Sequence, residues 1–489
     1  MDPVPTLDVF ILTFNAAKRQ IHAPVFARHL YNAFEQNASR LPELVVISLQ
    51  EMAPLAQAFI GSYMLNPYFQ CYESAVNLAA AKFAVEVERQ NPPTDHPYTL
   101  VATRNVGMTG ILLFARDPDM VKHLRATEIG FGAGDMANKG AVGLRLQYNK
   151  GNADGSLLAS TELTFVSAHL AAMEWNLEKR NKNWESIASG LVFDDPKQYT
   201  ESQAKQFSHR DNNDSGESEA RQALLSQDRT EKYLHDISIY KPGAHLFVAG
   251  DLNYRISRSA PTPDSVFPDR NPDNAPESPN HFSHFLARDQ LTAEKAAGRA
   301  LHGLSEAKIK FPPTYKLVLS PKSKPHAGLE ITGDEEDDMD EVEWSWALHR
   351  WPGWCDRILF QEIPWWAREI VGNKSMNILA YNALPPVRSS DHRAVFFRVE
   401  VPMLENDCLI PPNSAVEVEL RAKGVSSLPD PRVLLPFPID IQSWERRAQM
   451  RKWEPTIGWS MLISQSKESL VVFVTLLLVG LGTWWYRSR

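Results

Sequence analysis

The chain has few cysteines, no excess of positive charge and no recognisable secretion signal. Its 489 residues include 3 cysteines, which are odd in number and widely spaced: Cys71, Cys355 and Cys408. This pattern excludes a disulfide framework and a cysteine zinc site, and it is typical of a reducing compartment. A net charge of −8 argues against a general nucleic-acid-binding protein, because such proteins are usually basic. No basic region precedes the first apolar run, so we expect no signal peptide.

What is present is a large supply of apolar residues in short runs. Hydrophobic residues make up 43% of the chain, which is enough for one large domain or two ordinary ones. The runs are rich in Val, Ile, Leu and Phe, as in strands that are covered on both faces. Helical patterns lie between some of them. The mixture predicts two packed sheets with helices outside.

Many of these runs end in a polar residue that could take part in chemistry. Five such residues follow the runs in the first half of the chain: Asn15, Glu51, His169, Asp251 and Asn253. Two later segments, PGWCDRIL and SSDHRAV, add Asp356, Asp391 and His392. If the strand ends meet at one edge of a sandwich, carboxylates, amides and histidines converge there. Such a set suits one hard divalent cation, an activated water and a phosphate ester.

The motifs around these residues resemble the inositol polyphosphate 5-phosphatase family of the deoxyribonuclease I-like endonuclease/exonuclease/phosphatase superfamily. They occur in family order across roughly residues 7–400 and include SLQE, GDMANKGAVGLRL, SAHLAA, VAGDLNYRI, FPPTYK, RWPGWCDRIL and SSDHRAV. The resemblance implies an α/β fold, a four-layer α/β/β/α sandwich of two mostly antiparallel sheets with outer helices. We expect a catalytic domain at 1–401, a linker or small extension at 402–468 and a membrane anchor at 469–486.

The resemblance also implies a role for each polar residue. Glu51, with Asn15 close by, would bind Mg²⁺. Asp251 would take the proton from the attacking water, and Asn253 would hold that water or a phosphate oxygen. Because strand residues alternate between faces, Asp251 and Asn253 point to one side.

Two histidines and two further carboxylates complete the expected catalytic set. His392 would bind the scissile phosphate, and Asp356 would orient its ring, as carboxylates do for catalytic histidines. Asp391 would complete the anionic cluster, and His169 would help to stabilise the developing charge.

Selection of the substrate should depend on cations, because a bisphosphorylated inositol ring is strongly negative. Tyr315 and Lys316 resemble the family's contact to the 4-phosphate, and Arg255 would be held by the catalytic cluster or reach the substrate. Further phosphate partners would be Lys139, Arg350 and Arg357. A guanidinium group can donate two parallel hydrogen bonds to phosphate oxygens, which favours the arginines.

Several of these residues have a structural alternative. Asn15 at a strand end is ordinarily a turn residue, Lys139 could serve the turn at Gly140, and Tyr315 could simply pack. Arg357 could make only a structural ion pair. The chain also departs from the family, since Met173 stands where a second histidine is usual, while Ala137 and Ala394 replace a glycine and a proline.

These features predict Mg²⁺-dependent hydrolysis of the 5-phosphate of phosphatidylinositol 4,5-bisphosphate to the 4-phosphate by a tail-anchored, fungal-type enzyme. One alternative is a related phosphodiesterase, such as a sphingomyelinase or a nuclease. Another is a catalytically silent tether that only binds phosphoinositide. The preference among the bisphosphate, the 3,4,5-trisphosphate and soluble inositol phosphates stays open, as does the oligomeric state.

The C-terminal region differs from the rest of the chain. Residues 469–486 are 18 residues without a charge, and they end in Trp484, Trp485 and Tyr486. A helix of this length spans roughly 27 Å, slightly short for an average bilayer. A buried core helix has a similar composition, but the terminal position and the aromatic belt favour a transmembrane tail anchor.

Such an anchor predicts insertion after synthesis, so we expect tail-anchor insertion machinery as a partner. Basic residues are more numerous before 469 than after 486, which favours a cytosolic catalytic domain. The short span suits the endoplasmic reticulum membrane, and the outer mitochondrial membrane is the alternative. If 402–468 behaves as a coil, its reach is on the order of 45 Å, so the domain could act on its own membrane or on an apposed one.

Overall fold

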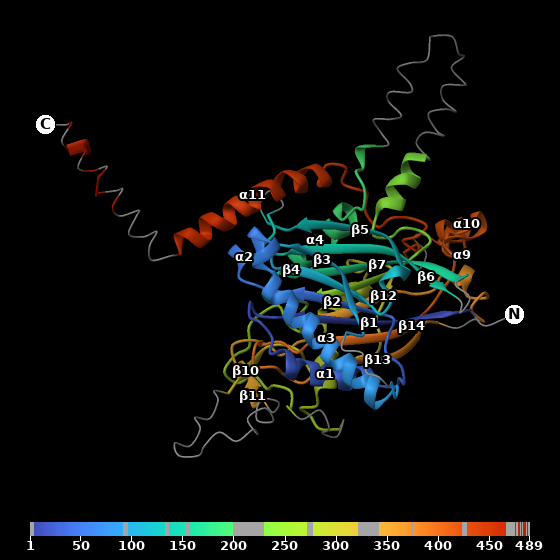
Figure 1. Cartoon of the computed structure of the whole chain (residues 1–489), viewed down its shortest axis with the longest axis horizontal. Helices are drawn as coiled ribbons and strands as arrows, with labels where there is room; N and C mark the ends of the chain where they lie inside the picture. The colour runs from blue at the N-terminus through green and yellow to red at the C-terminus, as the bar shows by residue number, and fades with distance from the viewer. Residues whose placement is uncertain are drawn as a thin grey trace, which may run out of the picture.

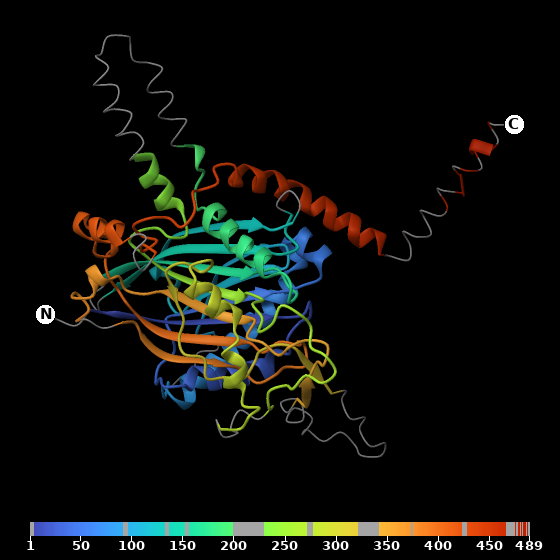
Figure 2. The same cartoon turned by 180° about the vertical axis from the view of Figure 1, so that it is seen from behind.

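The strands of the chain form two stacked sheets, and helices lie on their outer sides (Figures 1 and 2). The computed structural model describes residues 4–90, 96–132, 136–151, 156–198, 229–270, 277–320, 342–372, 375–422 and 428–465, and single positions between 475 and 487.

The first sheet has six strands in the order β13-β14-β1-β2-β4-β3. β1 is parallel to β2 and antiparallel to β14. Every residue of β2 is buried, as expected for a β-branched run that is covered on both faces. The strands are β1 (Thr6–Asn15), β2 (Leu44–Gln50), β3 (Thr99–Val106), β4 (Thr109–Ala115), β13 (Asn377–Ala383) and β14 (Val395–Pro402).

The second sheet also has six strands, in the order β5-β6-β7-β8-β12-β9. β7 is parallel to β8, and β12 runs antiparallel to both β8 and β9. A separate hairpin pairs β10 (Leu317–Leu319) with β11 (Trp344–Trp346). The strands are β5 (Val121–Gly130), β6 (Gly140–Gly151), β7 (Leu157–His169), β8 (Ala244–Asp251), β9 (Leu304–Ser305) and β12 (Asp356–Gln361).

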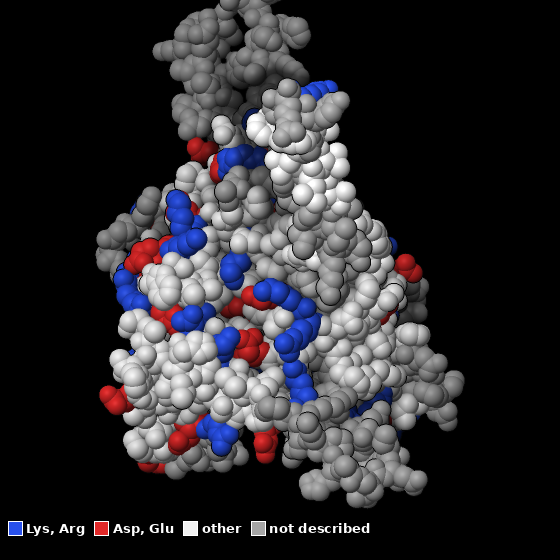
Figure 3. Space-filling view, turned by 90° about the vertical axis from the view of Figure 1, so that its left-hand side faces the viewer, with Lys and Arg blue, Asp and Glu red and all other residues white. Residues whose placement is uncertain are grey.

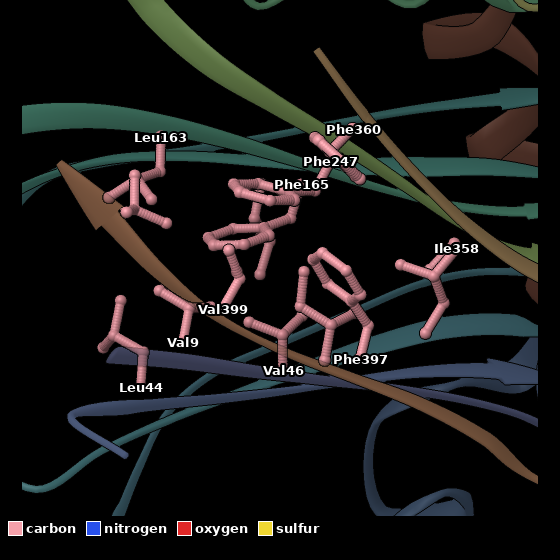
Figure 4. Packing of buried hydrophobic residues seen from close by; sticks show 14 of the residues in the cluster. Val9, Leu44, Val46, Leu163, Phe165, Phe247, Ile358, Phe360, Phe397 and Val399 are labelled. Atoms are coloured by element: carbon pink, nitrogen blue, oxygen red, sulfur yellow. The ribbon is translucent and has the colours of Figure 1, made fainter. Parts of the chain in front are cut away.

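The main core lies between the two sheets (Figure 4). Phe360 of β12 stacks on Phe397 of β14 across the interface, with ring centroids 5.2 Å apart. Phe165 and Phe247 stack in the same way within the second sheet, at 5.5 Å. Stacked aromatic pairs stabilise such a core beyond the apolar area they bury. The two sheets are therefore held as one rigid scaffold for the strand ends.

Helices complete the outer layers. α1 and α3 pack Phe26, Leu30 and Phe83 into the cluster on the first sheet, while α4 packs Trp184 and Ile187 against the second. The predicted four-layer sandwich is thus confirmed. The helices before residue 300 include α1 (Ala23–Glu35), α2 (Leu55–Ile60), η1 (Ser62–Met64), α3 (Asn66–Glu86), η2 (Pro118–Met120), α4 (Leu177–Gly190), α7 (Phe282–Leu286) and α8 (Gln290–Ala296).

The C-terminal part of the chain is not a free coil where the structure describes it. It contains η5 (Trp365–Ala367), α9 (Asn406–Leu409), α10 (Asn413–Ala422) and α11 (Ser443–Ser464). α11 packs on α2 and β5, so this stretch does not behave as the coil that the 45 Å reach assumed and fits the alternative of a small C-terminal extension. Within the described part of the chain, every helix is too short or too polar to cross a bilayer. Most of the expected anchor at 469–486 lies outside the described residues.

Candidate active site

Polar side chains from both sheets meet at the edge where β1, β2, β7 and β8 end. His169 and Asp356 both pair with Asp251 in the strand register. β7 and β8 are parallel and end at the same edge of the sheet. β12 is antiparallel to β8 and begins at that edge, so the last residues of β7 and β8 lie beside the first residue of β12. From the other sheet, Asn15 donates from Nδ2 to Asp251 Oδ2 at 3.0 Å. The structure therefore brings these four predicted residues together around one carboxylate.

Asp251 lies at the centre of the cluster and is almost fully buried. Its Oδ2 is 3.3 Å from Nε2 of His169, and its Oδ1 accepts the backbone N–H of Asn253 at 3.1 Å. Burial opposes its charge, but the hydrogen bond from His169 and the positive charges around it outweigh burial and lower the pKa of Asp251. Asp251 is therefore an ionised hydrogen-bond acceptor at neutral pH.

Lys139 reaches into the same cluster. Its Nζ contacts Nε2 of His169. Burial lowers the pKa of Lys139 to about 8, although the charges of Asp251 and Glu51 oppose the shift. Burial, with the charge of Lys139, also lowers the pKa of His169. His169 is thus neutral, and the Lys139 ammonium lies against the same Nε2 that faces Asp251, which places Lys139 in the site as well as beside its turn.

His392 and Asp356 form a second buried pair. His392 Nδ1 is 2.9 Å from Asp356 Oδ2, which also accepts from Thr314 Oγ1 at 2.7 Å. Burial opposes a charge on His392, but the carboxylates of Asp356, Asp251 and Asp391 outweigh it and raise its pKa to about 9. His392 therefore has a positive ring at neutral pH, which suits an anionic ligand.

The cluster also fits a divalent cation. Oxygens of Asp251 and Asp356 lie within 4.8 Å of each other and of a ring nitrogen of His392, so the two carboxylates face a cation while the positive ring of His392 suits the phosphate beside it. Oδ1 of Asp356 is buried and has no hydrogen-bond partner among the described residues. Oxygen ligands of this kind are preferred by hard cations. The chemistry of the donor set is thus compatible with Mg²⁺.

The two residues predicted to bind the metal lie beside this group. Asn15 bridges the sheets, since its Oδ1 accepts from the backbone N–H of Ala17 at 3.1 Å while its Nδ2 holds Asp251. Glu51 follows β2, and its carboxylate is 3.2 Å from Lys18 Nζ, at a half-exposed position. Asn15 therefore positions Asp251, while Glu51 lies nearer the entrance.

Basic and aromatic residues form the rim of the site. Lys316 Nζ donates to Oδ2 of Asp391 at 2.5 Å. The Arg255 guanidinium lies over the Tyr315 ring, 4.4 Å from its centroid, and that ring lies 4.5 Å from the ring of His392. Figure 3 shows this face of the molecule, where Lys and Arg side chains surround a hollow that contains acidic side chains.

Arg350 is held at the rim by the residue that replaces the family's second histidine. Its Nη2 is 3.2 Å from Sδ of Met173, and its Nη1 donates to Oε2 of the buried Glu174 at 3.4 Å. Met173 thus packs against an arginine where a histidine would offer a ring nitrogen.

Arg357 is a correction to the predicted substrate contacts. Its side chain is 1% exposed and donates to both carboxylate oxygens of Glu306 at 2.6 Å and to Asp289 at 3.0 Å. Successive strand residues point to opposite faces, so Arg357 points away from the side on which Asp356 lies. It is a structural ion pair, the alternative that the sequence left open.

Sequence reasoning missed three residues that hold side chains of the site in place. Thr314 hydrogen-bonds Asp356, Ser390 Oγ donates to the carbonyl of Asn15 at 2.5 Å, and Glu174 supports Arg350. Thr314 and Ser390 belong to the PTYK and SSDH motifs, which was an available signal. Glu174 had none, because its partner is far away in the chain.

A sandwich of two sheets with carboxylates and histidines gathered at one edge defines the endonuclease/exonuclease/phosphatase class. The model of endonuclease/exonuclease/phosphatase family 2 matches residues 12–398, and the chain belongs to this family.

Curated relatives are more distant and longer than this chain. Polyphosphatidylinositol phosphatase INP53 of Saccharomyces cerevisiae is 24% identical over 374 residues, which cover 75% of this chain and 24% of that protein. Type II inositol polyphosphate 5-phosphatase 14 of Arabidopsis thaliana is 27% identical over 290 residues, 58% of this chain and 21% of its own length. The match thus spans about a quarter of each relative.

Among solved structures, the inositol polyphosphate 5-phosphatase domain of SpSynaptojanin, determined with inositol (1,4)-bisphosphate and a calcium ion, is 21% identical with a TM-score of 0.48. The match covers 81% of this chain and 84% of that one.

Proposed function

We propose that the chain is a divalent-cation-dependent hydrolase that removes the 5-phosphate of phosphatidylinositol 4,5-bisphosphate and leaves the 4-phosphate. The observation that supports it most is the buried group of Asp251, Asp356 and His392, with ligand atoms within 4.8 Å, next to the Lys316 rim. The names of the curated relatives point to the same chemistry.

Each residue of the cluster has a task in this reaction. Asp251 accepts the proton of the attacking water, and Asn253 holds that water. His392, kept charged by Asp356, binds an oxygen of the scissile phosphate. Lys139 adds a second positive charge beside the carboxylates.

A bound Mg²⁺ would lower the pKa of the water, which a carboxylate as weakly basic as Asp251 requires. Glu51, with Asn15 close by, would hold the ion next to the carboxylates of Asp251 and Asp356.

Recognition of the neighbouring 4-phosphate falls to the rim. Lys316 is 28% exposed and pairs with the carboxylate of Asp391, which is itself partly exposed, so a phosphate can replace that partner. Arg350, which pairs with the buried Glu174, is a second cation for this phosphate. Charge-assisted bonds of this type are roughly twice as strong as neutral ones.

The place of action is part of the proposal. The apolar segment 469–486 would insert into the endoplasmic reticulum membrane through tail-anchor insertion machinery, with the catalytic domain in the cytosol. The uncharged sequence supports this, and the outer mitochondrial membrane is the alternative address.

Release of inorganic phosphate from dioctanoyl phosphatidylinositol 4,5-bisphosphate, measured with malachite green with and without Mg²⁺, tests the activity. We expect release with Mg²⁺ only, and only from lipids that bear a 5-phosphate. Binding without release would instead mean a silent tether. Release of phosphocholine from sphingomyelin, or cleavage of DNA, would mean a phosphodiesterase.

A further inference from the structure

α11 is locked to the catalytic domain by a buried ionic network. Arg447 is 4% exposed and donates to both carboxylate oxygens of Glu454, at 2.6 and 2.7 Å. It also donates to Glu128 of β5 at 3.1 Å, and Arg451 joins the same carboxylate at 2.7 Å. Two arginines of α11 thus bond one buried carboxylate of β5, so the helix is attached to the sheet at this point.

α11 crosses α2 on the side of the active site. A Cβ added at Gly458 would lie 2.7 Å from the Ala56 carbonyl and 2.9 Å from the Ile60 side chain, so the two helix backbones touch there. α2 begins at Leu55, shortly after Glu51 of the site. Figure 1 shows that the C-terminal end of α11 points to the same side as α2 and the β10–β11 hairpin.

Beyond this crossing, α11 exposes large apolar side chains. Trp459 is 41% exposed and Ile463 is 56% exposed, on the side opposite the buried Glu454. Residues 469–486, which lack charges, follow shortly afterwards. Exposed tryptophan beside aliphatic residues is typical of a helix that contacts the interface of a bilayer. The partner that fits this surface is therefore a lipid bilayer.

The chain between α11 and the apolar segment is short. From Ser464 to Ser469 a fully extended chain spans at most about 17 Å. If residues 469–486 lie in a bilayer, the docked helix and this short connection hold the catalytic edge close to that same bilayer.

We infer that α11 contacts the bilayer through Trp459 and Ile463 and, because it is docked on the domain, orients the active site toward the membrane that holds the tail. The enzyme then acts in cis, on lipid of the membrane in which it is anchored. This inference rests on the proposed function, and it decides between the two modes that the sequence leaves open.

The test uses the full chain inserted into vesicles, with substrate either in the same vesicles or only in a second population tethered to them. Wild-type protein should hydrolyse the lipid at least about tenfold faster in cis. Insertion of about 60 Gly/Ser residues after Ser464, with a reach of roughly 45 Å, should raise the tethered trans rate severalfold. Equal cis and trans rates for the wild type, or failure of the chain to float with vesicles, would overturn the inference.

The bilayer contact is tested by the double variant Trp459→Ala, Ile463→Ala. We expect a severalfold loss of the cis rate and an unchanged rate on monomeric dioctanoyl lipid. Trp365→Ala is the matched control, because Trp365 is 46% exposed but bonds Glu419 of α10, away from this edge. An unchanged cis rate, or an equal loss in the control, would contradict the contact. Absent turnover of dioctanoyl lipid by wild type would instead contradict the proposed function.

Discussion

Asp251 and Asp356 lie opposite each other on the adjacent antiparallel strands β8 and β12. Two buried carboxylates at such close range repel, and both are stabilised by partners on their outer sides. His169 and Asn15 bond the first, while His392 and Thr314 bond the second. The pair therefore offers a concentrated negative charge to a cation while each carboxylate keeps a fixed orientation.

Asp251→Asn should retain the fold and lose nearly all turnover. The change keeps the size of the side chain and removes the group that takes the proton, and general-base catalysis contributes about 10²–10⁴-fold. Phosphate release at saturating substrate measures the effect, with circular dichroism as the check on folding. Wild-type turnover in a folded variant would exclude Asp251 as the base.

Removal of divalent cations with EDTA should abolish activity, and Mg²⁺ should restore it. An oxygen-rich cluster without a cysteine ligand fits a hard cation. Glu51→Gln should then require a higher Mg²⁺ concentration for half-maximal rate, because one negative charge leaves the entrance. Full activity in EDTA would show that no cation is needed.

Lys316→Ala should reduce kcat/KM on the 4,5-bisphosphate far more than on phosphatidylinositol 5-phosphate. Loss of one charge-assisted bond costs roughly 1.5–3 kcal/mol, which corresponds to about 10–150-fold. Lys182→Ala is a control, since its partner is the exposed Glu185 on α4. Equal losses on both lipids would mean that Lys316 only holds Asp391.

The free energy of unfolding should fall as the pH drops below about 6.5, in part because of His245. Burial, together with the nearby Arg432, lowers the pKa of His245 to about 3, against the hydrogen bond to the Pro402 carbonyl. Below pH 6.5 the histidine takes up a proton in the unfolded chain but not in the folded chain. The free energy of unfolding is therefore highest above pH 6.5, and it decreases as the pH falls toward 3. At pH 5 the loss is about 2 kcal/mol.

The measurement is urea unfolding at pH 7 and pH 5 of wild type and His245→Gln, which lacks the titrating group. The decrease in the free energy of unfolding from pH 7 to pH 5 should be smaller in the variant than in wild type by about 2 kcal/mol. The exposed His22→Gln serves as control and should keep the wild-type difference. An identical pH dependence in all three proteins would rule out His245 as a source.

Arg357→Met should destabilise the fold by about 3–5 kcal/mol, because it leaves Glu306 and Asp289 buried without their cation. Arg125→Met is the matched control. Arg125 pairs with Asp194 at 3.5 Å on the surface, where such pairs contribute at most about 1 kcal/mol. Urea unfolding of the two variants and of wild type measures the loss of stability. A small effect at Arg357 would mean that its ion pairs are replaced by water.

The strands of the fold and much of the site could be predicted from the sequence. Apolar runs such as the one before Asp251 mark strands that are covered on both faces, and their polar last residues mark the edge at which the chain does chemistry. Asp251, Asn253, Asp356 and His392 were placed there by motifs, and the structure brings them together.

The tertiary structure alone decided the contacts between segments that are distant in the chain. It showed that Asp356 and Arg357, although adjacent in β12, have different surroundings. Asp356 faces the site, where it bonds Thr314, and Arg357 faces Glu306 on the other side of the strand. It also placed α11 on the domain through Glu128, whereas the sequence left open whether that region is a linker or a small C-terminal extension. The physical reason is that the apolar pattern of a strand depends on residues next to one another in the sequence. A buried charge, in contrast, is stable only beside an oppositely charged partner, and that partner comes from a distant segment of the chain.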